Sequence, residues 1–425
     1  MRSKIAVIAA GAALALALGG CSGTSSSNTP SGDDNGPLEI SFLTGSAEGT
    51  GSAFTMDALV TEYGNDTTLS MDYLGADMDQ KIQLMASQDA LPTFFQVGTP
   101  SQIVELYETG KIVDLEPVLE ELGVLDKLNP LSVDIIKNLY GGHLVGLPLE
   151  VAIEGFWYNE QIFADNGIEI PETWDDLADA AEQLESAGIQ PFATAGKAGW
   201  PVTRLISGYI SRDLGPDALP AIADGNAAFT DPEYVEGAEV ISGFAEAGYF
   251  GEAPDALDYG PAEDLFLQGE AAMYYMGSWA ISSFEDEERS LIGADNVGWF
   301  PVPNVDDGAG DSAQTPANVG LPMAVTAKTL TPQVKEFLTF LVENYGDVAM
   351  ENLDLITGFA TDVEPESALV SETLERVNST SDSIGWFESI QSSKGTTASQ
   401  EGATALVGGT LTPEQFMKQV QAAQE

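Results

Sequence analysis

Positive charge is scarce in this chain of 425 residues. Lys and Arg number 15 against 67 Asp and Glu, which gives a formal net charge of −52 and a pI near 4.1. Proteins that bind nucleic acid neutralise phosphates with Lys and Arg, so this balance argues against a nucleic-acid partner. The same balance disfavours electrostatic adhesion to an anionic lipid surface.

Cysteine and histidine each occur once, as Cys21 and His143. A single Cys excludes an internal disulfide framework, a Cys-based zinc site and a CxxC redox pair. A single His removes the commonest metal ligand and most catalytic triads that use His as the base. We therefore predict no metal site, no cofactor and no catalytic residue.

Hydrophobic residues, in contrast, are plentiful. They make up 44% of the chain, which is enough to bury sizeable cores despite the charge. The length predicts two domains, since one domain usually holds about 100–200 residues. The chain is therefore expected to be globular rather than disordered.

The N-terminus has the layout of an export signal. Arg2 and Lys4 precede an apolar run over 5–18, which is too short for a confident membrane span. The string Leu18-Gly19-Gly20-Cys21 then resembles the bacterial lipobox, which implies that Cys21 is lipidated and becomes the mature N-terminus. The alternative is an ordinary signal peptide with a chance Cys.

A polar stretch follows Cys21. We predict a lipoprotein signal peptide over 1–20 and a flexible tether over 21–36, which is rich in Ser, Thr, Asn, Gly and Asp. No later segment approaches the apolar length of a membrane span. The expected location is the outer face of the bacterial cytoplasmic membrane, with the chain exported and held by lipid on Cys21.

Strands and helices alternate along the body of the chain. Strands are expected at 38–43, 69–74 and 93–97, with helices at 77–87 and 101–109. This alternation indicates a parallel α/β organisation. Further strands are expected at 151–158, 271–276, 297–300 and 321–326, and further helices from the N-cap Thr173 to Gly188 and at 202–213, 232–247, 261–268 and 412–423.

Six segments of the body carry a family resemblance when they are taken in chain order. They are 78–95, 110–115, 142–148 with 157–159, 171–177, 266–273 with 277–279, and 412–416. The strongest is Phe266-Leu267-Gln268-Gly269-Glu270-Ala271-Ala272-Met273 leading to Gly277-Ser278-Trp279. Together they resemble the extracellular carbohydrate-binding proteins of ABC importers (family 1 solute-binding lipoproteins), a family that includes maltose-binding protein. Each segment alone is a weak signal, and six in the right order are a strong one.

The resemblance implies an α/β, two-lobed, periplasmic-binding-protein-like fold (type II) with discontinuous lobes joined by a hinge. The N-terminal lobe is expected to hold 37–150 plus 300–347, and the C-terminal lobe 151–299 plus 348–425. Ligand would contact both lobes only in the closed form, so binding would shift the equilibrium towards closure.

The resemblance also implies a function. A monomeric, non-enzymatic protein would capture a mono- or oligosaccharide and deliver it to the permease subunits of an ABC importer. One alternative is a binding protein for a polyamine, a peptide or iron. Another is a secreted glycoside hydrolase that uses two carboxylates, although with 67 acids a suitable pair is uninformative.

Aromatic residues are candidates because sugars stack their C–H faces on aromatic rings. Trp279 follows Gly277-Ser278 where the family commonly places a stacking aromatic, and Trp200 lies where the family's second lobe faces the cleft. Each could equally be a packing residue. Trp386 is a further candidate in the C-terminal helices, whereas Trp157, Trp174 and Trp299 are expected to pack in the interior.

Polar candidates come from loops at the carboxyl ends of strands, where open α/β sheets place their ligands. Any one acid of this chain is more often on the surface than in a site. Lys197 has more weight because cations are scarce. The polar candidates are Ser46, Glu48, Asp79, Thr99, Ser101, Glu150, Glu154, Lys197 and Asn318. Tyr274-Tyr275 resembles the tyrosine pair of iron binders, but neighbouring strand residues face opposite ways.

Overall fold

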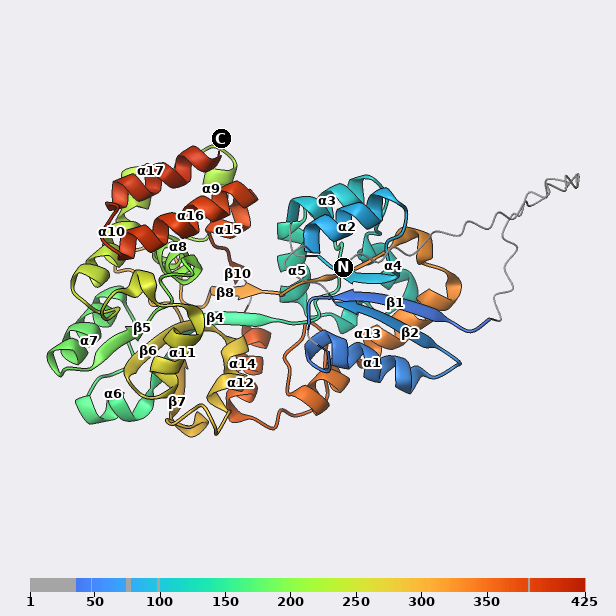
Figure 1. Ribbon diagram of the computed structural model, residues 1–425, viewed down its shortest axis with the longest axis horizontal. Coiled ribbons are helices and arrows are strands. Elements are labelled where there is room, and N and C mark those ends of the chain that lie inside the picture. The colour runs from blue at the N-terminus through green and yellow to red at the C-terminus, as the bar shows by residue number, and fades with distance from the viewer. Residues whose placement is uncertain (1–35, 47, 74–77, 98–99, 381–382, 425) are drawn as a thin grey trace, which may run out of the picture. The chain divides into compact units, whose positions relative to one another are not determined.

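The computed structural model describes residues 36–424 apart from 47, 74–77, 98–99 and 381–382. The described chain contains two β-sheets, and helices surround each of them (Figure 1). The predicted signal peptide and tether, with Cys21, lie outside the described residues.

The first sheet has the strand order β2-β1-β3-β9. Strands β1, β2 and β3 are parallel, with Phe42 opposite Phe94, and β9 joins β3 in the antiparallel sense. The bounds of these strands are β1 (Glu39–Thr44), β2 (Thr68–Tyr73), β3 (Phe94–Gln96) and β9 (Met323–Val325). The predicted parallel organisation of the first three strands is therefore confirmed.

Helices α1 and α13 pack together beside this sheet. Phe337 of α13 lies 5.2 Å from the ring of Tyr63 and 6.0 Å from that of Phe94, so aromatic packing joins helix to sheet. The helices around the first sheet are α1 (Gly51–Tyr63), α2 (Met78–Ser87), α3 (Pro100–Glu108), α4 (Leu115–Leu122), η1 (Leu125–Lys127), α5 (Pro130–Leu139), η5 (Ala327–Thr329) and α13 (Pro332–Leu353).

The second sheet has the order β10-β8-β4-β6-β5, and β7 also pairs with β4. Its central strand β4 is buried along its whole length and antiparallel to β6, β7 and β8. The bounds are β4 (Ala152–Asn159), β5 (Gln190–Ala193), β6 (Ala271–Gly277), β7 (Val297–Phe300), β8 (Thr315–Asn318) and β10 (Ser383–Ile384).

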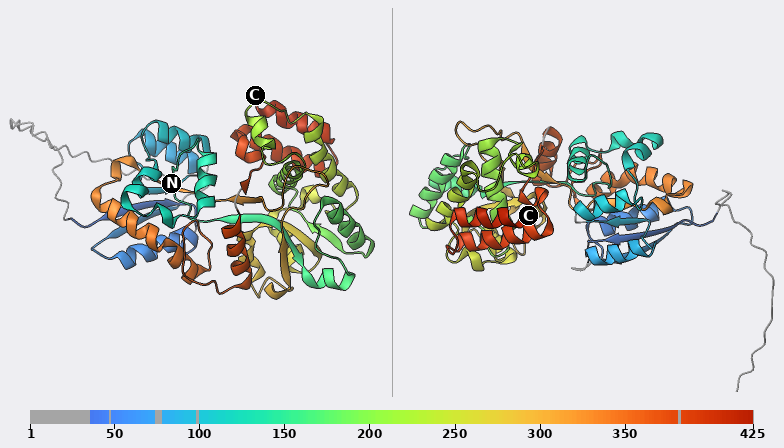
Figure 2. Two further views of the ribbon diagram at one scale, coloured as in Figure 1. Left: turned by 180° about the vertical axis from the view of Figure 1, so that it is seen from behind. Right: turned by 90° about the horizontal axis from the view of Figure 1, so that it is seen from above.

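Helices cover both faces of the second sheet (Figures 1 and 2). Thr173 caps α7 with its hydroxyl, as the sequence predicts, and it also forms a capping box with Asp176. The helices are α6 (Glu160–Asn166), α7 (Trp174–Ser186), α8 (Trp200–Leu214), α9 (Ala218–Ala223), α10 (Pro232–Glu246), η2 (Pro254–Ala256), α11 (Tyr259–Leu267), η3 (Ser278–Ala280), α12 (Ile281–Phe284), η4 (Ala294–Asn296), α14 (Ala368–Ser379), α15 (Phe387–Ile390), α16 (Ser393–Val407) and α17 (Pro413–Gln424).

The two faces of β6 belong to different cores. Tyr274 is buried with Phe266 and Phe284 in one cluster, and Tyr275 is buried with Phe156 in the other. The expectation that the two tyrosines face opposite ways is therefore confirmed, and they do not form a paired iron ligand set. Among the described residues, no group of three His, Cys, Asp or Glu side chains is placed to hold a metal ion.

Several elements were not predicted from the sequence. They are α4, α5, α9, β5, β8 and β10, and the strands among them have two to four residues each. The prediction assigned 300–347 to the N-terminal lobe, whereas β8 pairs with β4 and β10 of the second sheet. Within the described part of the chain, no helix is long and apolar enough to cross a membrane.

Candidate ligand-binding site

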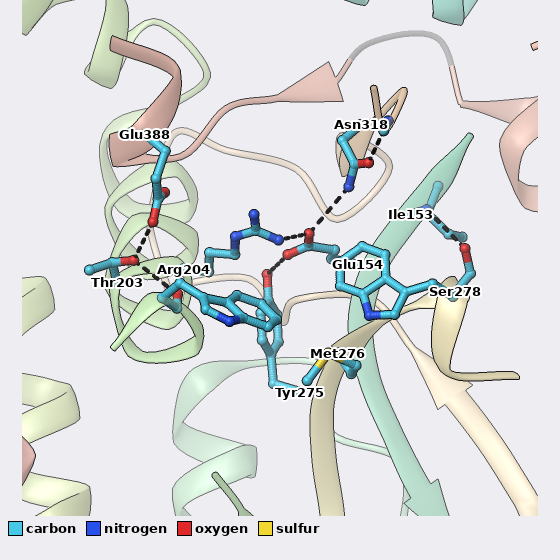
Figure 3. Close-up of polar contacts among 12 residues, drawn as sticks. Ile153, Glu154, Thr203, Arg204, Tyr275, Met276, Ser278, Asn318 and Glu388 are labelled. Atoms are coloured by element: carbon cyan, nitrogen blue, oxygen red, sulfur yellow. Dashed lines mark hydrogen bonds and ion pairs between the residues drawn. The ribbon is translucent and has the colours of Figure 1, made fainter. Parts of the chain in front are cut away.

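Glu154 is the charged residue at the centre of the candidate site. Strand pairing sets it opposite Gly277 at the end of β6, while β8 brings Asn318 opposite Ala152. The Glu154 carboxylate is fully buried and forms an ion pair with Arg204 (Figure 3). The Tyr275 hydroxyl donates to it at 3.2 Å, and the Asn318 amide donates at 3.5 Å.

Burial dominates the electrostatics of Glu154. It raises the pKa of the Glu154 carboxyl to about 7 from an ordinary 4.5, because the charged form loses its hydration. Arg204 and the hydrogen bond from Tyr275 lower this pKa and offset only part of the burial effect. The carboxyl therefore titrates near neutral pH with its partners already in place.

Arg204 lies between two indole rings. Its guanidinium carbon is 4.5 Å from the ring centroid of Trp200 and 4.4 Å from that of Trp386. Trp200 and Arg204 are four residues apart in α8, so they share one face of the helix, while Trp386 comes from the segment before α15. These cation–π contacts fix the guanidinium that holds Glu154.

Two further aromatic rings, Tyr259 and Trp279, lie next to Trp200. Trp200 stacks on Tyr259 with ring centroids 6.3 Å apart and planes at 29°, and it lies 6.1 Å from Trp279. The Trp279 indole donates to the Tyr259 hydroxyl at 3.2 Å. Trp279 keeps 38% of its surface exposed, unlike the core tryptophans, so one side of this ring is open to a ligand.

The absence of a side chain on Gly277 leaves space for the Trp279 ring. A Cβ built on Gly277 would come within 2.0 Å of the Trp279 ring. The backbone of Gly277 has φ −81° and ψ 163°, which any residue adopts, so its lack of a side chain matters for space and not for conformation. The Gly277-Ser278-Trp279 string thus positions this indole.

A cavity of about 300 Å³ adjoins the open side of Trp279. Glu150, Trp279 and Asn318 all line it, together with Gly320 and Ser278. Its walls therefore combine an aromatic ring, a carboxylate and an amide, which is the mixture that binds hydroxyl-rich ligands. Desolvation by burial raises the pKa of the Glu150 carboxyl.

The first sheet contributes a polar edge to the same neighbourhood. The Ser46 and Ser52 hydroxyls lie 2.9 Å apart, and Thr44 donates to the Gln96 side-chain oxygen at 2.8 Å. A Cβ on Gly51 would lie 3.0 Å from Ser46 Oγ and 3.4 Å from Glu150 Oε1. The carboxyl end of β1 therefore borders Glu150.

The remaining predicted residues either lie away from this cavity or fall outside the part of the chain that the structure describes. Lys197 forms an exposed ion pair with Asp258 at 2.7 Å, and Asp258 caps the helix that carries Tyr259. Glu48 is exposed in the turn between β1 and α1. Thr99 lies outside the described residues, and so do the side chains of Asp79 and Ser101.

Of the three tryptophans expected in the interior, two are buried and Trp299 is partly buried. Trp157 is buried and donates its indole N–H to the Met276 carbonyl at 3.0 Å. Trp174 is buried at the start of α7, and Trp299 packs at 6.5 Å from Trp157. These three pack against other core residues, whereas Trp200 and Trp386 enclose Arg204 and Trp279 lies next to Trp200.

Sequence reasoning missed Arg204, Tyr259 and Glu388. Glu388 accepts a hydrogen bond from Thr203 at 2.8 Å beside the Arg204 sandwich. One signal for Arg204 was available, since it lies one helical turn after Trp200 in a chain with 15 cations. Tyr259 and Glu388 carry no such signal.

Comparisons with known proteins agree with this geometry. Residues 47–346 match the family model described as bacterial extracellular solute-binding protein. An uncharacterised ABC transporter extracellular-binding protein of Pyrococcus horikoshii is 28% identical over 48% of this chain and 46% of its own length. The multiple sugar-binding protein of Streptococcus mutans is 26% identical over 46% of this chain and 47% of its own. The matched region spans about half the length of these relatives.

Solved structures share the fold over nearly the whole chain. A chitin oligosaccharide binding protein has a TM-score of 0.75 and 24% identity, and covers 91% of this chain and 98% of its own. A probable secreted solute-binding lipoprotein from Streptomyces coelicolor has a TM-score of 0.76 and 20% identity, with coverages of 92% and 99%. These likenesses confirm the predicted two-lobed α/β fold.

Proposed function

Because the chain belongs to the bacterial extracellular solute-binding protein family, we propose that it captures a mono- or oligosaccharide and delivers it to the permease of an ABC importer. Members of this family are binding proteins, so the prediction of a non-enzymatic protein is confirmed. The identity of the solute and the permease partner belong to the proposal.

One observation carries the carbohydrate assignment. The half-exposed Trp279 ring borders a cavity whose polar groups are Glu150 and Asn318. An aromatic face beside hydrogen-bonding groups matches the flat C–H face and hydroxyl rim of a sugar ring. Sugar-binding proteins among the relatives and solved structures, named for multiple sugars, chitin oligosaccharide and raffinose, support the same reading.

Hinge closure is the proposed mechanism. The cavity is lined by Glu150, next to the first-sheet edge, and by Trp279, which follows β6 of the second sheet. A ligand that contacts both residues would stabilise the closed arrangement, because only there are both contacts made at once. We place 37–150 in the N-terminal lobe and, because β7 and β8 pair with β4, 151–318 in the C-terminal lobe.

Lipid attachment at Cys21 is the proposed link to the membrane, with 1–20 removed and 21–36 as the tether of a monomeric protein. The lipobox-like string and the polar stretch after it support this proposal. The test is to express the wild type and Cys21→Ser in a bacterial host and to fractionate the cells. We expect the wild type in the membrane fraction and the variant in the soluble exported fraction. Equal partition of both would contradict the anchor.

A thermal-shift screen tests the solute class. The purified protein is mixed with mono- and oligosaccharides, polyamines and short peptides, and its melting temperature is recorded. We expect a sugar to raise the melting temperature, since a ligand that binds only the folded state stabilises it. A rise with a polyamine or peptide, and with no sugar, would refute the carbohydrate assignment. Turnover of any glycoside above background would restore the hydrolase alternative.

A further inference from the structure

The cavity beside Trp279 has a one-sided charge. Three of its lining residues are acids, namely Glu150, Glu285 and Asp354, and no Lys, Arg or His lines it. Its remaining walls are largely apolar and include Ile281 and Ile356. A neutral sugar would use these carboxylates only as acceptors for its hydroxyl groups, whereas a positive group on the solute would also offset their charge.

Glu150 is an acid of this cavity that has no ion-pair partner within the described part of the chain. Burial is the sole cause that raises the pKa of its carboxyl. Asp354 differs, because its two oxygens accept the backbone N–H groups of Glu366 and Ser367 at 3.1 and 2.9 Å. Glu285 is exposed to solvent at the rim.

Two of the few cations of the chain are already held in ion pairs with other acids. Arg204 is paired with Glu154, and Lys197 is paired with Asp258. An unpaired, largely buried carboxylate is costly unless something binds it, and a positive group of the solute is the remaining candidate. The excess of 67 acids over 15 bases in the whole chain also raises the local concentration of cationic solutes.

Trp279 suits the same kind of solute. An indole face attracts an ammonium group through its quadrupole, and it also stacks on the C–H face of a sugar ring. Trp279 borders the cavity that Glu150 lines, and its ring stays open on that side. One small molecule with both a sugar ring and an ammonium group would satisfy both residues.

We propose that the solute is an amino sugar, a hexosamine or an oligosaccharide of hexosamines, whose ammonium group binds the Glu150 carboxylate and whose ring stacks on Trp279. This inference rests on the proposed function and narrows it to a cationic class of sugar.

Calorimetric titration tests the inference with three matched ligands. These are the glucosamine disaccharide, its N-acetylated form and the neutral glucose disaccharide of the same linkage. We expect the amine to bind the wild type roughly 10- to 100-fold more tightly than the other two, the range of a charge-assisted hydrogen bond. Affinity for the amine should fall as the pH is lowered through the range in which Glu150 takes up a proton.

Two variants separate the charge of Glu150 from its shape. Glu150→Gln keeps the size and most of the hydrogen-bonding capacity, and should remove the preference for the amine over the neutral sugar. Glu185→Gln makes the same change at an exposed position of α7 and should leave all affinities unchanged. Unfolding curves of both variants show whether each is folded.

The outcomes distinguish this inference from the function on which it rests. Tighter binding of the neutral or N-acetylated sugar, or an unchanged preference in Glu150→Gln, would overturn the amino-sugar inference and leave carbohydrate binding intact. Binding of spermidine with no binding of any sugar would overturn both.

Discussion

Glu150 and Glu154 lie four residues apart where the chain enters β4, and the protein surrounds them in opposite ways. Glu154 has Arg204, Tyr275 and Asn318 around its carboxylate. Glu150 forms no ion pair with the residues that the structure describes, and it lines a cavity. A carboxylate whose partners are all supplied by the protein is part of the scaffold, whereas one without partners is available to a ligand.

The comparison extends to the tryptophans. Trp200 and Trp386 are held against Arg204 on the Glu154 side, and their rings position a charge. Trp279 borders the Glu150 side and keeps an open face. The Glu154 side and the Glu150 side of the site therefore each combine aromatic rings with a carboxylate. Only on the Glu150 side are the ring and the carboxylate both open to a solute.

Removal of Arg204 should have the largest effect on stability. Arg204→Ala leaves the buried Glu154 charge unpaired, and we expect the free energy of unfolding to fall by about 3–5 kcal/mol at pH 8. Urea denaturation measures this change. Lys197→Ala breaks an exposed ion pair and is the control, with a far smaller expected cost because solvent screens the pair. Equal costs for the two variants would show that Glu154 does not depend on Arg204.

The second-largest effect should be a dependence of the free energy of unfolding on pH, caused by Glu154. Its folded pKa of about 7 exceeds the ordinary 4.5, so the folded state binds the proton more tightly than the unfolded state. The resulting stabilisation is complete below pH 4.5 and is lost as the pH rises through 7. Relative to Glu154→Gln, the wild type should lose about 2–3 kcal/mol across this window in urea denaturation. Parallel pH curves would contradict the raised pKa.

Gly277→Ala should disturb the open half of the site alone. The new methyl would overlap the Trp279 ring, which must then turn away from the cavity. We expect sugar affinity to fall about tenfold in calorimetry, while the free energy of unfolding changes by less than about 1 kcal/mol because the ring is half exposed. Gly243→Ala, where nothing lies within 4 Å of the added Cβ, is the control and should bind normally.

The smallest effect should be a gain in stability. Glu150→Gln removes a charge that burial disfavours and that no partner compensates, so the free energy of unfolding should rise by about 1 kcal/mol at pH 8 without ligand. Chemical denaturation measures it, with Glu185→Gln as the neutral reference. A loss of stability comparable to that of Arg204→Ala would mean that Glu150 is a scaffold residue as well.

Much of the fold could be predicted because its signals are local. The alternation of strands and helices and the Thr173 capping box depend on neighbouring residues, and both are found in the structure. Strands β8 and β10 could not be predicted, since both are short and each is paired with a segment far away in the chain, β8 with β4 and β10 with β8. Short strands are formed by such tertiary pairing rather than by their own pattern.

Only part of the candidate site could be predicted, because its other contacts join segments that are far apart in the chain. Glu154, Trp200, Trp279, Asn318 and Trp386 were all named from the sequence, and the structure brings them together. The sequence could not show that Arg204 joins them, because Glu154 lies 50 positions before it and Trp386 far after it. The difference between Glu150 and Glu154 depends entirely on such distant partners.

Calorimetric titration of the wild type and Trp279→Ala with the sugar that gives the largest thermal shift tests the central claim most directly. Carbohydrate binding at this cavity predicts one site per chain in the wild type and a loss of affinity of roughly 10-fold or more in the variant, with its unfolding curve nearly unchanged. Binding of equal affinity by the folded Trp279→Ala protein would place the solute elsewhere and contradict the account.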